Sequence, residues 1–160
     1  MDSYLDTIFG LPVHALVVHG AVVLIPLAAV GAILMAVRPA FSRRFGTLVV
    51  ILAGAGAFSA VIAKESGEQL AKRVGTPTQH ADLGQVLPWI AVGLFVLVLV
   101  FWLFDRGIPA NKYRPMWLVI LAIVIVLASC LAIFWTVRVG HTGSQAVWTS
   151  VIEKTNPKGQ

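Results

Sequence analysis

The sequence predicts an all-α integral membrane protein, a four-helix bundle with both termini on the outer side of the membrane. Of its 160 residues, 58% are apolar and 12% are charged, which leaves too little polar surface to cover a soluble globule. Four stretches without Asp, Glu, Lys or Arg are long enough to cross roughly 30 Å of hydrocarbon at about 1.5 Å per helical residue. No internal repeat is evident, so residues 1–160 are expected to form one four-span domain.

The first two spans are expected at residues 11–37 and 46–63. No Lys or Arg precedes the first span, and it is longer than the apolar core of a signal peptide, so we expect it to remain in the mature protein. The second span should continue as a helix to residue 73 and stop at Gly75, because glycine commonly ends helices. Small residues gather in both spans. They either let the two helices pack closely or leave a slot for a flat ring such as a porphyrin.

The last two spans are expected at residues 77–104 and 116–139. Thr76-Pro77-Thr78-Gln79 fits a capping box with proline at the first helical position, so the third helix should begin near Pro77. Pro26 and Pro88 lie inside the first and third helices and should kink them.

Basic residues indicate the orientation. Six of the twelve lie in the short connections after spans one and three, namely Arg38, Arg43, Arg44, Arg106, Lys112 and Arg114. The other six lie on the opposite side, so the raw count does not decide the orientation. The first span, however, has no basic residue before it and three just after it, and six of the seven acids lie opposite these two connections. By the positive-inside rule we therefore expect these connections to face the cytoplasm, in a multi-pass protein of the bacterial inner (plasma) membrane. The net charge of +5 therefore indicates topology and contact with the lipid bilayer, and no nucleic acid is expected as a partner.

All four histidines fall at span ends on the predicted outer side: His14, His19, His80 and His141. His19 lies deeper in the membrane than His14, and intramembrane ionisable groups usually mark function. The alternative is a structural histidine that is satisfied by a hydrogen bond. His14 and His19 are about 140° apart around an ideal helix, so they cannot both point at one axial site.

Charged residues approach the same rim. Arg138 lies one turn before His141 and is a candidate partner for a carboxylate such as a haem propionate. Glu65 and Glu68 are candidate metal ligands from the second helix. The competing interpretations are that Arg138 snorkels to lipid headgroups and that the two glutamates form a solvated helix end.

Three classes of function compete. In the first, haem b is bound between helices by two axial histidines for electron transfer, with His19 and either His141 or His80 as favoured ligands and His14 in a supporting or alternative role. In the second, Cu, Zn or Fe is bound by the four histidines with Glu65 or Glu68. In the third, the chain is a non-redox structural or transport subunit whose histidines form hydrogen bonds or respond to pH. A redox partner and further copies of the chain are the protein partners to consider.

Other chemistry is disfavoured. Cys130 is the only cysteine and lies midway along the fourth span, so the sequence offers no disulfide, thiolate metal cluster or covalent haem attachment motif. Ser59 and Ser66 lack a recognisable nucleophile elbow, which argues against a hydrolase. The sequence thus favours a redox carrier or binding subunit over a stand-alone enzyme.

Four short motifs resemble those of a bacterial family of membrane proteins, the domain of unknown function 2231. They are LPVHALVVH at residues 11–19, SGE at 66–68, HADLG at 80–84 and GHTG at 140–143. The resemblance implies a small four-helix membrane protein and leaves activity open. The chain departs from the family pattern at Ser144, where a second glycine is expected, and at Trp148, near the position of a tyrosine.

Overall fold

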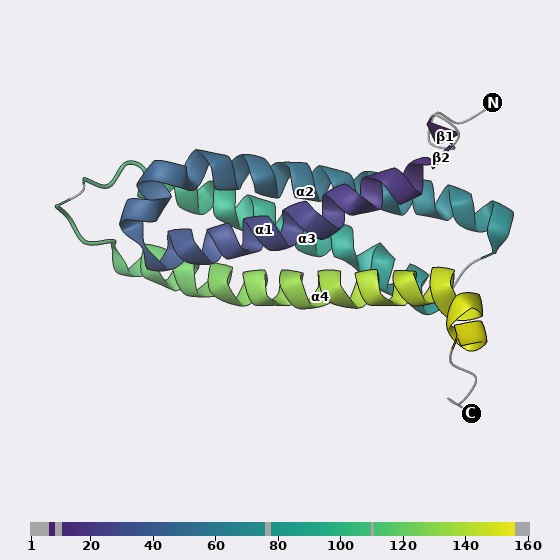
Figure 1. Cartoon of the computed structure of the whole chain (residues 1–160). Helices are drawn as coiled ribbons and strands as arrows, with labels where there is room; N and C mark the ends of the chain where they lie inside the picture. Colours follow the sequence, from purple (N-terminus) through teal and green to yellow (C-terminus); the bar gives the residue numbers. More distant parts are fainter. Residues whose placement is uncertain (1–6, 9–10, 76–77, 110, 156–160) are drawn as a thin grey trace.

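Four long helices make up most of the protein. A computed structural model of the chain describes residues 7–8, 11–75, 78–109 and 111–155. The helices are α1 (Val13–Val37), α2 (Pro39–Val74), α3 (Thr78–Asp105) and α4 (Met116–Thr155). Two short strands, β1 (Thr7–Ile8) and β2 (Leu11–Pro12), pair antiparallel just before α1. Figure 1 shows the helices running up and down along one axis, which confirms the predicted all-α four-helix bundle.

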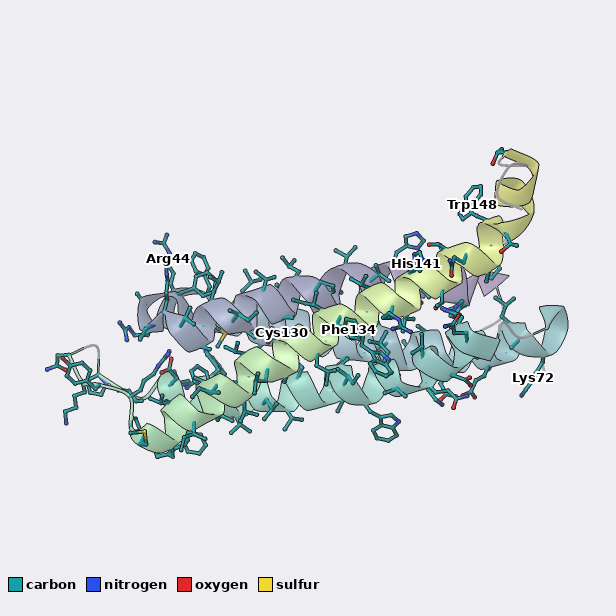
Figure 2. The ribbon with its side chains drawn as sticks, turned by 90° about the horizontal axis from the view of Figure 1, so that it is seen from below. Arg44, Lys72, Cys130, Phe134, His141 and Trp148 are labelled. Atoms are coloured by element: carbon teal, nitrogen blue, oxygen red, sulfur yellow. The ribbon has the colours of Figure 1, made fainter. Side chains whose placement is uncertain are left out.

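The helices are arranged as two neighbouring hairpins. α1 packs against α2 and α4, α3 packs against the same two helices, and α1 and α3 lie diagonally across the bundle. We call the end where α1 and α3 begin the histidine end, and the opposite end, where α2 and α4 begin, the arginine end (Figure 1). At the histidine end the last turns of α4, which carry Trp148, bend away from the bundle (Figure 2).

Two helices extend further than the apolar spans from which they were predicted. α2 begins at Pro39 rather than residue 46, because proline suits a first helical position and a single residue, Arg38, connects α1 to α2. α4 continues past residue 139 to Thr155. Gly75 follows α2 with a φ of 86° and donates its N–H to the carbonyl of Ala71 at 3.0 Å. α3 is described from Thr78, and the predicted cap residues 76–77 lie outside the described residues.

Each helix contains a segment long and apolar enough to cross a membrane: Val13–Val37, Pro39–Lys72, Gln79–Asp105 and Met116–Thr149. Large apolar side chains cover the outside of the bundle, among them Leu27, Ile51, Phe58, Ile123 and Leu127, each at least half exposed. In water this surface would be an extensive apolar patch, whereas in a bilayer it contacts acyl chains. The chain is therefore a membrane protein.

Small residues hold α1 and α2 together. The residues that share this role are buried: Ala28, Ala29, Gly31 and Ala32 in α1, and Ala53, Gly56, Ala57 and Ala60 in α2. A Cβ added to Gly56 would lie 3.1 Å from Cγ1 of Ile25 and 3.2 Å from the Ile25 backbone nitrogen. The small residues were expected either to let the helices pack closely or to leave a slot for a flat ring. At these turns the structure shows close packing of the helices.

A buried ion pair ties the arginine end together. Arg114 donates through Nε to Oδ1 of Asp105 at 2.7 Å and through Nη2 to Oδ2 at 3.0 Å. Its guanidinium also donates to the carbonyls of Met35 and Ala36, which lie in the last turn of α1 and lack intrahelical partners. Ser42 of α2 donates to the same Asp105 carboxylate. One cluster thus links the ends of α1 and α3 to the beginnings of α2 and α4.

Candidate functional site

His14 lies in the first turn of α1 and rests on α2. Its Nδ1 donates to the carbonyl of Ala63 at 2.8 Å. The ring lies against Gly67, where an added Cβ would be 2.9 Å from Cε1 and 3.0 Å from Nδ1. Real Cβ atoms essentially never approach other atoms this closely, so the imidazole can occupy this position only because residue 67 has no side chain.

His80 occupies an equivalent place on the other hairpin. It lies in the first turn of α3, and its Nδ1 donates to the carbonyl of Val139 on α4 at 3.1 Å, with Thr142 Oγ1 a further 3.4 Å contact. A Cβ added to Gly143 would lie 2.9 Å from Cε1 of His80 and 3.2 Å from Nδ1. Glycine is therefore required here for the same steric reason as under His14.

We call the carbonyl that accepts from each ring, together with the hydroxyl bonded to that carbonyl and the glycine against the ring, a histidine seat, and the two seats repeat one pattern. In each, a backbone carbonyl accepts from the imidazole Nδ1 and also from a buried hydroxyl three residues later, and the glycine under the ring follows that hydroxyl. The residues that fill these three roles are Ala63, Ser66 and Gly67 in α2, and Val139, Thr142 and Gly143 in α4. The bundle thus contains a structural repeat that is not evident as a repeat in the sequence.

The two imidazoles meet across the bundle. Their ring centroids are 6.2 Å apart and their planes cross at 77°. Both rings are half-buried, and they come from the diagonal helices α1 and α3. Because Nδ1 of each ring donates to a carbonyl, the neutral imidazole carries its proton there and Nε2 retains its lone pair. Each ring, one on α1 and one on α3, therefore keeps one nitrogen whose lone pair the carbonyl bond does not use.

The other predicted histidines lie elsewhere. His19 is exposed on α1, and its Nδ1 donates to the carbonyl of Ala15 in its own helix at 2.6 Å. His141 is exposed on α4, next to the buried Thr142 (Figure 2). The structure thus brings together His14 and His80 and leaves His19 and His141 on the outer surface of the bundle.

The charged candidates are also exposed. Arg138 stacks over the ring of Phe134 at 5.8 Å. Glu65 and Glu68 face Lys64, with Nζ to carboxylate distances of 3.4 and 2.9 Å. Among the residues that the structure describes, no group of three or more His, Cys, Asp or Glu side chains is placed to hold a metal ion.

Sequence reasoning missed the two glycines and their neighbouring hydroxyls as parts of the site. The signal was present, since Ser66-Gly67 and Thr142-Gly143 fall within the short motifs of the second and fourth helices. Each dipeptide pairs a small hydroxyl residue with glycine, and each faces a histidine in the first turn of the preceding helix. Recognising this requires knowing which helices are neighbours.

Comparison with known proteins identifies the family. A search of curated proteins and of solved structures finds no match to the chain. A family model described as "Predicted membrane protein (DUF2231)" matches residues 10–156, a range that includes both histidine seats. The chain therefore belongs to the DUF2231 family of predicted membrane proteins.

Proposed function

We propose that this protein binds haem b through His14 and His80 and transfers electrons within the membrane. The observation that carries the proposal is the pair of imidazoles, 6.2 Å apart on diagonal helices, each with Nδ1 bonded to a carbonyl. A histidine that ligates a metal through Nε2 typically donates its other N–H to a carbonyl or carboxylate, which fixes the ring and raises the basicity of the ligating nitrogen.

His14 and His80 are the residues that would hold the haem iron, because their rings lie 6.2 Å apart between centroids and come from two different helices. Haem b ligated by two histidines supplies reversible one-electron transfer. The role of this chain is to hold both rings, orient them through Ala63 and Val139, and shield them among four helices.

His14 and His80 take precedence as ligands over His19 and His141. The first pair is half-buried and its rings are in T-shaped proximity, whereas the second pair is exposed on the outside of the bundle. We nominate Arg138 as the cation for a haem propionate, because it lies on α4 one turn before Thr142, at the same end as the site.

A copper ion bound by the same two rings is the second candidate. The proximity of the two rings, 6.2 Å apart between centroids, supports it, and imidazole is a good ligand for copper as well as for Fe and Zn. Glu65 and Glu68, which flank Ser66 and Gly67 in α2, are the acidic candidates for further ligands, but both pair with Lys64.

We place the histidine end on the outer face of the bacterial inner membrane. The supporting observation is that Arg38, Arg43, Arg44, Arg106, Lys112 and Arg114 all belong to the opposite end. Under the positive-inside rule that end faces the cytoplasm, and a redox partner would approach the haem from outside or from within the bilayer.

The test is a reduced-minus-oxidised visible spectrum of the full chain, purified in detergent after expression with added haem precursor, followed by a pyridine haemochrome assay and metal analysis. We expect b-type bands in the wild type and in the controls His19→Ala and His141→Ala, and loss of the bands in His14→Ala and His80→Ala. Retention of the bands in both His14→Ala and His80→Ala would refute the ligand assignment. Stoichiometric copper without haem would replace the first candidate by the second.

A further inference from the structure

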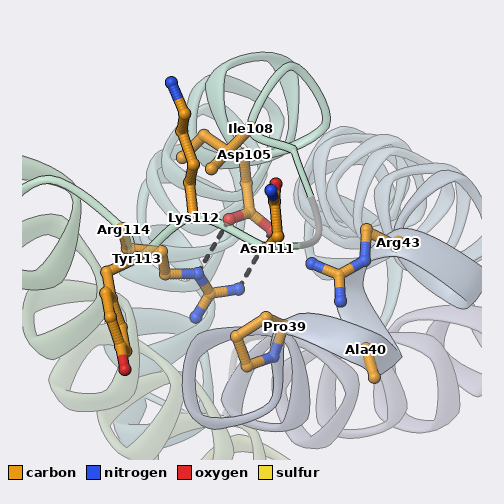
Figure 3. A pocket seen from close by; sticks show the side chains of 9 residues that line it. All are labelled: Pro39, Ala40, Arg43, Asp105, Ile108, Asn111, Lys112, Tyr113 and Arg114. Atoms are coloured by element: carbon orange, nitrogen blue, oxygen red, sulfur yellow. Dashed lines mark hydrogen bonds and ion pairs between the residues drawn. The ribbon is translucent and has the colours of Figure 1, made fainter.

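The arginine end contains a cavity that the histidine site does not involve. Its volume is about 620 Å³, and it lies where α2 begins and where the connection between α3 and α4 returns. The buried Asp105–Arg114 ion pair is part of its lining (Figure 3). The polar side chains of Arg43, Asn111 and Lys112 also line it.

The cavity carries a positive charge. Asp105 and Arg114 offset each other, and the donors of Arg114 are engaged with that carboxylate and with the end of α1. Arg43 and Lys112 remain, and neither forms an ion pair within the described part of the chain. In Figure 3 the guanidinium of Arg43 points toward Asn111, and the side chain of Lys112 extends past Ile108, away from Arg43.

The start of α2 adds to this charge. Pro39 and Ala40 line the cavity at the first turn of the helix, so the positive end of the α2 dipole faces it. Two cations, an amide and a helix N-terminus around one open space form a binding site for an anion with several oxygens.

The position of the cavity indicates the source of that anion. It lies at one end of four helices that are long and apolar enough to cross a membrane, and lipid headgroups surround the ends of such helices. Tyr113 lines it and is 98% exposed, and Met116 and Trp117, which follow at the start of α4, are also exposed. Such side chains contact glycerol and acyl groups at the membrane interface. We propose that this cavity binds the phosphate of an anionic phospholipid.

Nearby arginines provide a control for non-specific attraction. Arg44 stacks over Phe45 at 5.3 Å and Arg106 stacks over Trp102 at 4.7 Å, and neither lines the cavity. Removing these two charges changes the net charge of this end as much as removing Arg43 and Lys112. A difference between the two double variants therefore reports the cavity and not the general positive potential.

The experiment measures binding of phosphatidylglycerol to the full-length protein in detergent by native mass spectrometry, with phosphatidylcholine and inorganic phosphate as competing probes. We expect preference for phosphatidylglycerol, and a loss of affinity of roughly fivefold for each cation removed, so roughly twenty-five-fold for Arg43→Ala with Lys112→Ala. Arg44→Ala with Arg106→Ala should stay within about twofold of the wild type.

Two outcomes would overturn the proposal. Equal weakening in both double variants would mean diffuse attraction of anionic lipid to a basic surface. Binding of inorganic phosphate as tightly as phosphatidylglycerol would mean that the cavity takes a free anion. The measurement needs no cofactor, so its result is independent of whether His14 and His80 bind haem.

Discussion

Replacing Gly143 by alanine should move His80 out of its seat. The added Cβ would lie 2.9 Å from Cε1 and 3.2 Å from Nδ1 of the ring, about half an ångström inside ordinary contact, so the imidazole must shift and its bond to Val139 must lengthen. Overpacking of this kind costs about 1–3 kcal/mol. Alanine also gains up to about 1 kcal/mol over glycine in helix propensity, which offsets part of this cost.

Gly140 is the matched control, because it lies one turn earlier in α4 and an added Cβ there meets nothing within 4 Å. Gly140→Ala should be neutral or stabilising, and Gly143→Ala should be less stable than it by about 1–3 kcal/mol. The assay is reversible unfolding in mixed micelles, with NMR of labelled histidine to follow the Nδ1–H of His80. Equal stability of the two variants, with an unchanged His80 signal, would refute the steric argument. Gly67→Ala should behave like Gly143→Ala because Gly67 supports His14 in the same way.

Three further predictions concern the rest of the bundle. Arg114→Ala leaves Asp105 buried without its cation, and should destabilise the protein by about 3–5 kcal/mol in the same unfolding assay, with Asp105→Asn in the Arg114→Ala background recovering part of the loss. Gly56→Ala should separate α1 from α2 and lower stability, whereas Gly93→Ala, where an added Cβ meets nothing within 4 Å, should not; equal melting of the two would contradict the close packing. A Gln79→Cys variant should react with an impermeant maleimide added outside intact cells, and protection until the cells are lysed would reverse the proposed orientation.

Helix number and approximate extent could be predicted from the sequence because the determinants are local. Apolar runs of the required length and Gly75 after the end of α2 are visible along the chain, whereas the start of α2 at Pro39 was not predicted. The full lengths of α2 and α4 were less accessible, because their terminal turns are polar and hydropathy alone does not separate a polar helix from a loop. The Asp105–Arg114 cluster was also missed, since a basic residue in a short connection is equally well explained by topology.

The pairing of histidines depended on helix rotation. His14 shares a helix face with Ala21, Ile25 and Ala32, all buried, whereas His19 shares its face with the exposed Val23. His19 was favoured as a ligand because it lies deeper in the membrane than His14. Whether a side chain points into the bundle, however, depends on the face of the helix that carries it. Which histidine of another helix it then meets depends on the diagonal placement of α1 and α3, which no local pattern specifies.

The polar groups at the two ends of the bundle differ in how many of their atoms are bonded within the protein. At the arginine end, Arg114 and Asp105 use their polar atoms on each other, on Ser42 and on two carbonyls of α1, so the cluster is complete within the protein. At the histidine end, His14 and His80 each use Nδ1 on a carbonyl, and Nε2 retains the capacity to bind a further group. Neither Nε2 is an enclosed atom without a hydrogen-bond partner; in the described residues those are Oε1 of Gln69 and Oγ of Ser129. The proposed shared ligand therefore rests on the proximity of the two rings and on the three-residue pattern that holds each of them, and not on a cost of unsatisfied nitrogen.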